Sequence, residues 1–214
     1  IFQSYHNFKQ SINPIEATKG GETNFNDTIA NYISTNYQNN LLKKYSLYLD
    51  TLNTFDSTSV TSSQWLSIQT MRWDCNIKRA GLLQPLITLA SPIYNLPSFE
   101  LMPLIQVQSL HLYVAQLAAG KSVHPFQTVQ DYDNWLERVQ DYFTFLDTCI
   151  TKMKLGMGQG IVLPQSLVQK VLPQLEPFIN ESVENHLFYI PIKNMPSDFN
   201  SVESDRLITA YHSM

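Results

Sequence analysis

The side chains that could bind a metal ion or transfer a proton are few in this sequence, and they do not gather into a site. The 214 residues include five histidines. No two of them lie three or four residues apart and no His-Glu-x-x-His motif occurs, so the pattern that places two zinc ligands on one helix face is missing. We therefore expect no catalytic residue, metal site or cofactor within this chain. The histidines are His6, His111, His124, His186 and His212.

The glycines of residues 156–160 have the alternation of a nucleotide-binding loop, but their setting differs. They follow a predicted helix rather than a strand, and Ile161 stands where the dinucleotide fingerprint needs its third glycine. We interpret these glycines as the end of a helix.

The two cysteines, Cys75 and Cys149, also give no sign of a nucleophile. Neither has a sequence neighbour that would mark it as activated, and no Gly-x-Ser-x-Gly motif is present. Both lie among apolar residues of predicted helices, which favours buried free thiols over a disulfide.

The most suggestive polar cluster is the sequence Gln-Val-Gln-Ser-Leu-His at residues 106–111, which stands in an otherwise apolar stretch. Buried polar groups need hydrogen-bond partners, so these side chains either satisfy irregular backbone or face a wet cavity. We favour the first interpretation, in which these side chains satisfy irregular backbone. If they instead face a cavity, the candidates for a binding cleft are Gln106 and His111.

Composition narrows the classes of partner. Charged residues make up 15% of the chain and the net charge is -4, without the clustered lysine and arginine that phosphate binding needs, so we expect no nucleic-acid partner. No apolar run approaches the length of a bilayer, so we expect no membrane-spanning segment. The hydrophobic share of 43% is sufficient for a domain with a sizeable core.

Apolar residues at helical spacing predict an all-α fold, an irregular multi-helix bundle with long helices. In the first half we expect helices at residues 2–12, at 28–55 and from a cap at Thr61 to about Gly81. Four prolines in residues 85–103 predict irregular chain with short helical turns. Residues 104–119 fit either a helix or an extended segment followed by a helix.

The second half has clearer helix boundaries. Thr128 with Asp131 predicts the start of a long helix, and the glycines at 156–160 predict its end. Pro164 suits the first turn of another helix that reaches Leu175, with a kink at Pro173.

Towards the C-terminus, strand signals are confined to short runs such as residues 188–192. Asn200 and Glu203 have the spacing of a capping box at the start of a last helix. That helix would normally continue, so we expect a single helical region that is truncated at its C-terminus.

Three segments resemble one bacterial family. They are residues 13–18 (Asn-Pro-Ile-Glu-Ala-Thr) with Gly21, residues 106–111, and the run from Pro125 to Pro164. This likeness is to the domain-of-unknown-function 885 family, bacterial proteins regarded as zinc metallopeptidase candidates, many of them predicted lipoproteins. The resemblance implies a mostly helical fold and a location in the bacterial periplasm or cell envelope, with a lipid anchor.

In that family, the His-Glu motif that would hold zinc lies downstream of the matched segments. The resemblance therefore implies that residues 1–214 are the N-terminal helical region of a zinc-dependent peptidase-like protein, with the catalytic part beyond residue 214. On this view the chain forms part of the wall of a substrate cleft, and its partners are the C-terminal part and a peptide. The alternative is a non-enzymatic binding or structural domain of an envelope protein.

Overall fold

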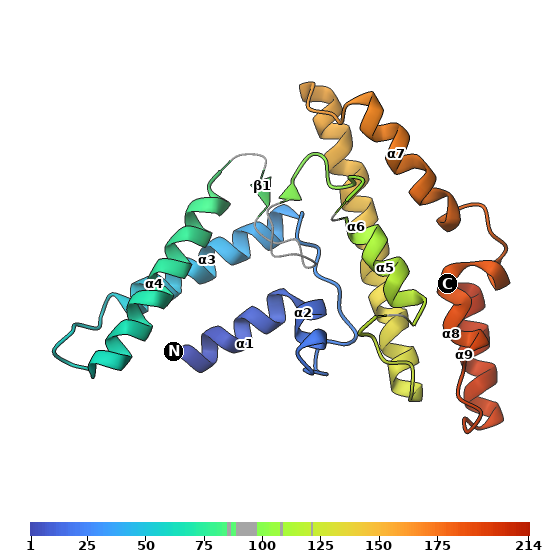
Figure 1. Cartoon of the computed structure of the whole chain (residues 1–214), viewed down its shortest axis with the longest axis horizontal. Coiled ribbons are helices and arrows are strands. Elements are labelled where there is room, and N and C mark those ends of the chain that lie inside the picture. Colours follow the sequence, from blue (N-terminus) through green and yellow to red (C-terminus); the bar gives the residue numbers. More distant parts are fainter. Residues whose placement is uncertain (85–86, 89–97, 108, 121) are drawn as a thin grey trace.

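The computed structural model describes residues 1–84, 87–88, 98–107, 109–120 and 122–214, and within these ranges the fold is all-α, as predicted (Figure 1). Helices form two groups, each with a hydrophobic core of its own. The first group, which we call the wing, lies on the left of Figure 1 and contains α1 (Phe2–Ile12), α3 (Thr35–Leu52) and α4 (Ser62–Leu82). The second group, the body, is built on α5 (Leu110–Ala118), α6 (Val129–Gln159) and α9 (Ser201–Ser213).

Aromatic rings hold the wing together. The ring of Tyr5 in α1 meets that of Tyr48 in α3 edge to face at 5.1 Å, and Phe8 meets Tyr45 in the same way at 5.5 Å. α4 begins at the predicted Thr61 with a complete capping box. A short helix, α2 (Pro14–Lys19), follows α1 and leads from the wing to the body. It is anchored there by Ile15, which is fully buried in the core of the body.

The helix expected over residues 28–55 is shorter than predicted, and this expectation was wrong at its start. α3 begins at Thr35, after Ser34 accepts a hydrogen bond from the backbone of Tyr37. Residues 28–34 are not helical because they attach to the body instead. The backbone N–H of Ile29 donates to the Asp141 carboxylate at 2.9 Å, and the side chain of Ile29 is buried against α6 and its neighbours.

α6 spans the body and begins as predicted. Thr128 and Asp131 form a reciprocal capping box at its N-terminus. Of the three glycines expected to end it, only Gly160 does so, with a left-handed φ of 71°. Gly156 is inside the helix, where a Cβ atom would lie 2.6 Å from the Ile161 carbonyl oxygen. Its role is therefore to permit close packing.

The chain after α6 returns along the body in short pieces. Pro164 is the N-cap of α7 (Gln165–Leu175), and Pro173 lies inside this helix. The strand suggested for residues 188–192 is absent, because Phe188 lies in a 3-10 turn that buries it in the core and Pro191 lies in the first turn of a short helix. At α9 the side chain of Asn200 accepts from the Glu203 backbone, which is one of the two hydrogen bonds of the predicted capping box. The intervening elements are η1 (Glu176–Phe178), η2 (Val183–Asn185), η3 (Leu187–Tyr189) and α8 (Ile190–Lys193).

The proline-rich stretch at residues 85–103 falls largely outside the described residues, so its predicted irregular form is untested there. Its described part contains a two-residue antiparallel pair of strands, β1 (Ile87–Thr88) and β2 (Ser98–Phe99). Among the described residues of 104–119, helix is confined to α5, which agrees with the second of the two alternatives. In the ranges that the structure describes, no helix is both long enough and apolar enough to cross a membrane.

Candidate functional site

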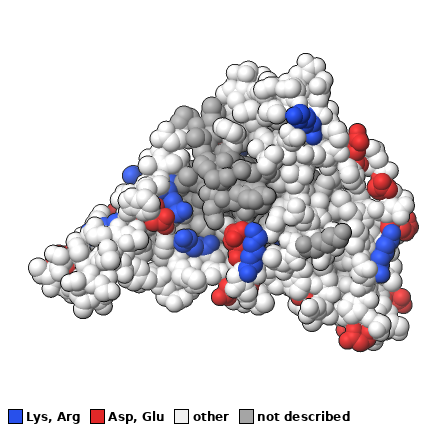
Figure 2. Space-filling model, viewed as in Figure 1, with Lys and Arg blue, Asp and Glu red and all other residues white. Residues whose placement is uncertain are grey.

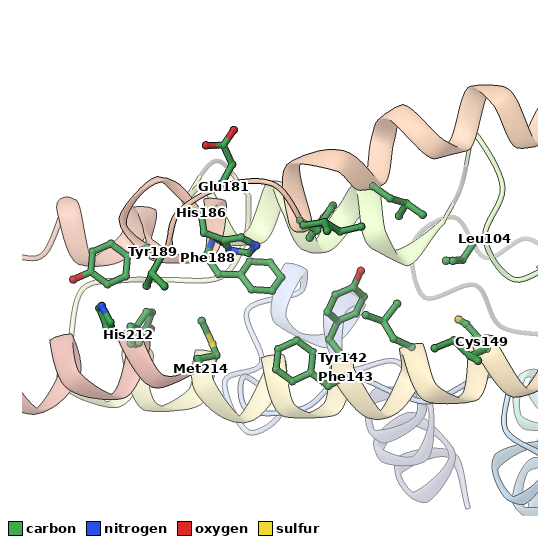
Figure 3. Close-up of a pocket in the computed structure, with 17 residues that line it drawn as sticks. Leu104, Tyr142, Phe143, Cys149, Glu181, His186, Phe188, Tyr189, His212 and Met214 are labelled. Atoms are coloured by element: carbon green, nitrogen blue, oxygen red, sulfur yellow. Dashed lines mark hydrogen bonds between the residues drawn. The ribbon is translucent and has the colours of Figure 1, made fainter.

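An apolar groove of about 580 Å³ runs along α6, between this helix and the segment that leads from α7 to α9 (Figure 3). α6 supplies one wall because residues three and four apart share a helix face. The opposite wall is aromatic: Phe188 meets Phe178 at 5.8 Å and Tyr142 of α6 at 6.2 Å between ring centroids. The α6 side of the groove consists of Tyr142, Phe143, Leu146, Cys149 and Ile150.

The polar side chains of the groove lie toward the end that holds α9. His186 accepts a hydrogen bond from the Phe188 backbone through Nδ1 at 3.2 Å, which fixes its ring beside the aromatic wall. His212 lies 3.7 Å from the carboxylate of Glu184, and both of these side chains are more than half exposed. Figure 3 shows His212 and Tyr189 near one end of the groove and Leu104 and Cys149 near the other.

Three titratable groups on the walls of the groove are buried, and burial keeps them protonated at neutral pH. Burial raises the pKa of the Cys149 thiol and of the phenols of Tyr142 and Tyr211 above their usual values. A thiol or phenol with a raised pKa is a poor nucleophile and a poor base at neutral pH. These three side chains are therefore suited to contact apolar groups rather than to take part in covalent chemistry.

The described residues do not supply a zinc site. Among them, no group of three or more His, Cys, Asp or Glu side chains lies close enough together to hold a metal ion. Both cysteines are free and buried, Cys75 in the core of the wing and Cys149 in the core of the body. The prediction of free thiols is confirmed.

The two cleft candidates from the sequence are brought together by Gln174 of α7. Its side-chain amide donates to the backbone carbonyl of Gln106 at 3.2 Å, and its side-chain oxygen lies 3.1 Å from Nε2 of His111. His111 is fully buried, and its Nδ1 has no hydrogen-bond partner among the described residues. Burial also lowers the pKa of His111, so its ring is neutral at pH 7. Neither candidate lines the groove, and their role in binding stays a prediction.

A buried polar cluster lies nearer the N-terminus of α6, around Arg138, whose side chain has no exposed surface. Its guanidinium reaches Nδ1 of His124 at 2.8 Å and donates to the hydroxyl of Thr18 at 2.6 Å. A third bond runs to the backbone carbonyl of Phe25 at 3.0 Å. Burial lowers the pKa of Arg138 to about 10, which leaves it charged at neutral pH.

The partners of His124 determine which of its nitrogens carries the proton. Arginine only donates, so Nδ1 accepts and the ring proton is on Nε2, which lies 3.0 Å from the backbone carbonyl of Asp131. Burial, followed by the positive charge of Arg138, lowers the pKa of His124 to about 4. His124 is therefore a neutral structural bridge between Arg138 and the first turn of α6.

Comparison with known proteins agrees with the resemblance read from the sequence. The family model described as "Bacterial protein of unknown function (DUF885)" matches residues 14–214. The chain belongs to this family. No curated protein and no solved structure matches it. In this DUF885 member, two of the segments that carry the resemblance meet in space, because Arg138 of the third donates to Thr18 of the first.

Sequence reasoning missed both Arg138 and the groove. Arg138 lies three residues after Trp135 and one before Val139, so it occupies the core face of α6, and this spacing is a signal that could have found it. A weaker indication of the groove is the run of aromatic residues near Phe188. The α6 wall of the groove ends at Ile150 and the facing wall begins at Leu175, so only the tertiary structure brings them together.

Proposed function

We propose that residues 1–214 form the non-catalytic helical region of a zinc-dependent peptidase-like protein and that they supply one wall of its substrate cleft. The observation that carries this proposal is the apolar groove, whose volume of about 580 Å³ is in the range of small-ligand sites. Its neutral thiol and phenols suit the recognition of apolar peptide side chains. The resemblance supports a position of the zinc ligands outside this chain. It also supports a location of the protein in the bacterial periplasm or envelope.

Ile150 offers a direct test, because it lines the groove and is still half exposed. In the intact protein that contains this chain, Ile150→Glu places a charge where an apolar peptide side chain would lie. We expect the KM for cleavage of peptides with bulky apolar residues to rise about tenfold, with kcat little changed, since binding rather than chemistry is affected.

The matched control is Leu47→Glu on α3, because Leu47 is exposed to a similar extent but belongs to the wing. Its KM should stay within about twofold of the wild type. Equal kinetics for Ile150→Glu and wild type would remove the groove from the cleft. Gln106→Ala and His111→Ala belong in the same series, and unchanged kinetics for both would withdraw these two candidates. Stoichiometric zinc binding by residues 1–214 alone would overturn the assignment of catalysis to another part.

The second candidate function is a binding module without catalysis. The observation in its favour is that the groove needs no reactive group to hold a partner, and burial keeps the Tyr142 phenol and the Cys149 thiol on its wall protonated. Zinc content and peptide hydrolysis of the intact protein separate the two. A protein that binds apolar peptides through the groove, yet contains no zinc and cleaves none of them, is the binding module.

A further inference from the structure

The turn between α6 and α7 differs in charge from the rest of the chain. Residues 155–169, which we call the tip, contain no charged side chain, and Lys154 and Lys170 bracket them. The wider segment 148–175 holds three lysines and no acidic residue. Lys152 is buried and paired with Glu100, so the exposed cations of this segment are Lys154 and Lys170. The remainder of the chain carries eleven basic and eighteen acidic residues, so this end without acidic residues belongs to an acidic molecule.

The apolar side chains of the tip are exposed. Met157 is 70% exposed, Val162 54% and Leu155 50%. Behind them α7 adds little packing, since Val171 is its one buried residue. In Figure 1 the tip projects from the upper end of the body, and in Figure 2 the face of this projection shows no lysine, arginine or acidic residue at its extremity.

A projecting apolar surface with lysines at its base matches the chemistry of an anionic lipid surface. Apolar side chains gain by leaving water for the interfacial layer, and lysines beside them reach the phosphate groups with their long stems in the apolar zone. The acidic remainder of the chain is repelled by the same surface, so only the tip is favoured to approach it. The tip has lysines at its base and no acidic side chain, so the surface that complements it is anionic.

We propose that the tip docks on anionic phospholipid membranes, with Leu155, Met157 and Val162 in the interfacial layer and Lys154 and Lys170 beside phosphates. This contact lies on the surface of one leaflet. It is separate from the apolar groove and does not depend on the proposed function.

Vesicle co-sedimentation of the intact protein, prepared without any lipid modification, tests this proposal. The probes are vesicles of equal parts phosphatidylcholine and phosphatidylglycerol, and vesicles of phosphatidylcholine alone. We expect the bound fraction to be at least fivefold higher with phosphatidylglycerol and to fall when salt is raised to about 0.5 M. The double variant Met157→Asp and Val162→Asp should lose at least tenfold in partitioning, and Lys154→Glu with Lys170→Glu should lose the preference for phosphatidylglycerol.

The control replaces Leu66, an equally exposed leucine of α4, by aspartate. Binding by Leu66→Asp should equal that of the wild type, and thermal unfolding of each variant checks that it is folded. Absence of vesicle binding by the wild type overturns the proposal, as does unchanged binding by the double variant. Self-association that Met157→Asp abolishes, without any lipid binding, would assign the tip to a second copy of this chain instead.

Discussion

The two ends of α6 are built for different tasks, although they belong to one continuous helix. From Val129 to Cys149 the helix buries a tryptophan, an arginine and three aromatic rings against neighbouring elements. Beyond Cys149 only Lys152 and Gly156 are buried, while apolar residues such as Met157 face water. The comparison teaches that apolar spacing alone does not identify core: the first part stabilises the fold, and the second leaves its apolar side chains exposed.

The largest expected effect is a difference in stability between variants at Arg138 and at Lys154, two cations of the same helix. Arg138→Met leaves the buried groups of Thr18 and His124 without their donor, so we expect unfolding to become easier by about 3–5 kcal/mol. Lys154→Met removes a charge from an exposed side chain and should change stability by less than about 0.5 kcal/mol. Urea unfolding followed by circular dichroism measures both. Equal effects would mean that the two parts of α6 do not differ in this way.

Lowering the pH should reduce the stability of the fold, through buried groups around the first part of α6. The pKa of His124 is lowered to about 4 in the folded state, so between pH 6.5 and 4 the unfolded chain binds a proton that the folded chain does not. Stability is therefore greatest above pH 6.5 and falls as the pH decreases to 4, by about 3 kcal/mol for this group. Burial lowers the pKa of His111 as well, which acts in the same direction.

The urea midpoint at pH 7 and at pH 4.5, for the wild type and for His124→Gln, measures this contribution. The glutamine keeps a hydrogen-bonding side chain but has no proton to gain, so its midpoint should depend less on pH. If the variant has the same pH slope as the wild type, His124 is not the group responsible.

The smallest expected effect concerns two glycines near the end of α6. Replacing each by alanine should change the stability in opposite directions. Gly156→Ala forces a Cβ atom against the Ile161 carbonyl and should destabilise by about 1–3 kcal/mol. Gly158→Ala meets nothing within 4 Å and should stabilise the helix by about 0.5–1 kcal/mol. Thermal unfolding midpoints that move in opposite directions confirm the difference. A stabilising Gly156→Ala would show that the end of α6 is not packed against Ile161.

The sequence allowed the caps of α4 and α6 to be predicted because each depends on two residues three positions apart. The start of α3 was predicted wrongly because the N–H of Ile29 bonds to Asp141, more than a hundred residues away, which no local pattern reveals. Phe188 was assigned to a strand from its apolar neighbours, whereas burial in the core imposes a 3-10 turn.

The candidate site was less predictable than the fold. The groove exists only because α6 and the segment around Phe188 are brought together, and each wall alone has the spacing of ordinary core. The sequence did single out Gln106 and His111, and the structure joins them through Gln174, a residue that had no distinguishing pattern.

The three contacts of Arg138 have a consequence for how this family varies. A guanidinium donates in several fixed directions at once, and a lysine ammonium does not reproduce that fork. A change at position 138 would therefore leave an acceptor on Thr18 or His124 unmatched unless these residues changed with it. We expect positions 18, 124 and 138 to be inherited together, so that three residues distant in sequence behave as one evolutionary unit.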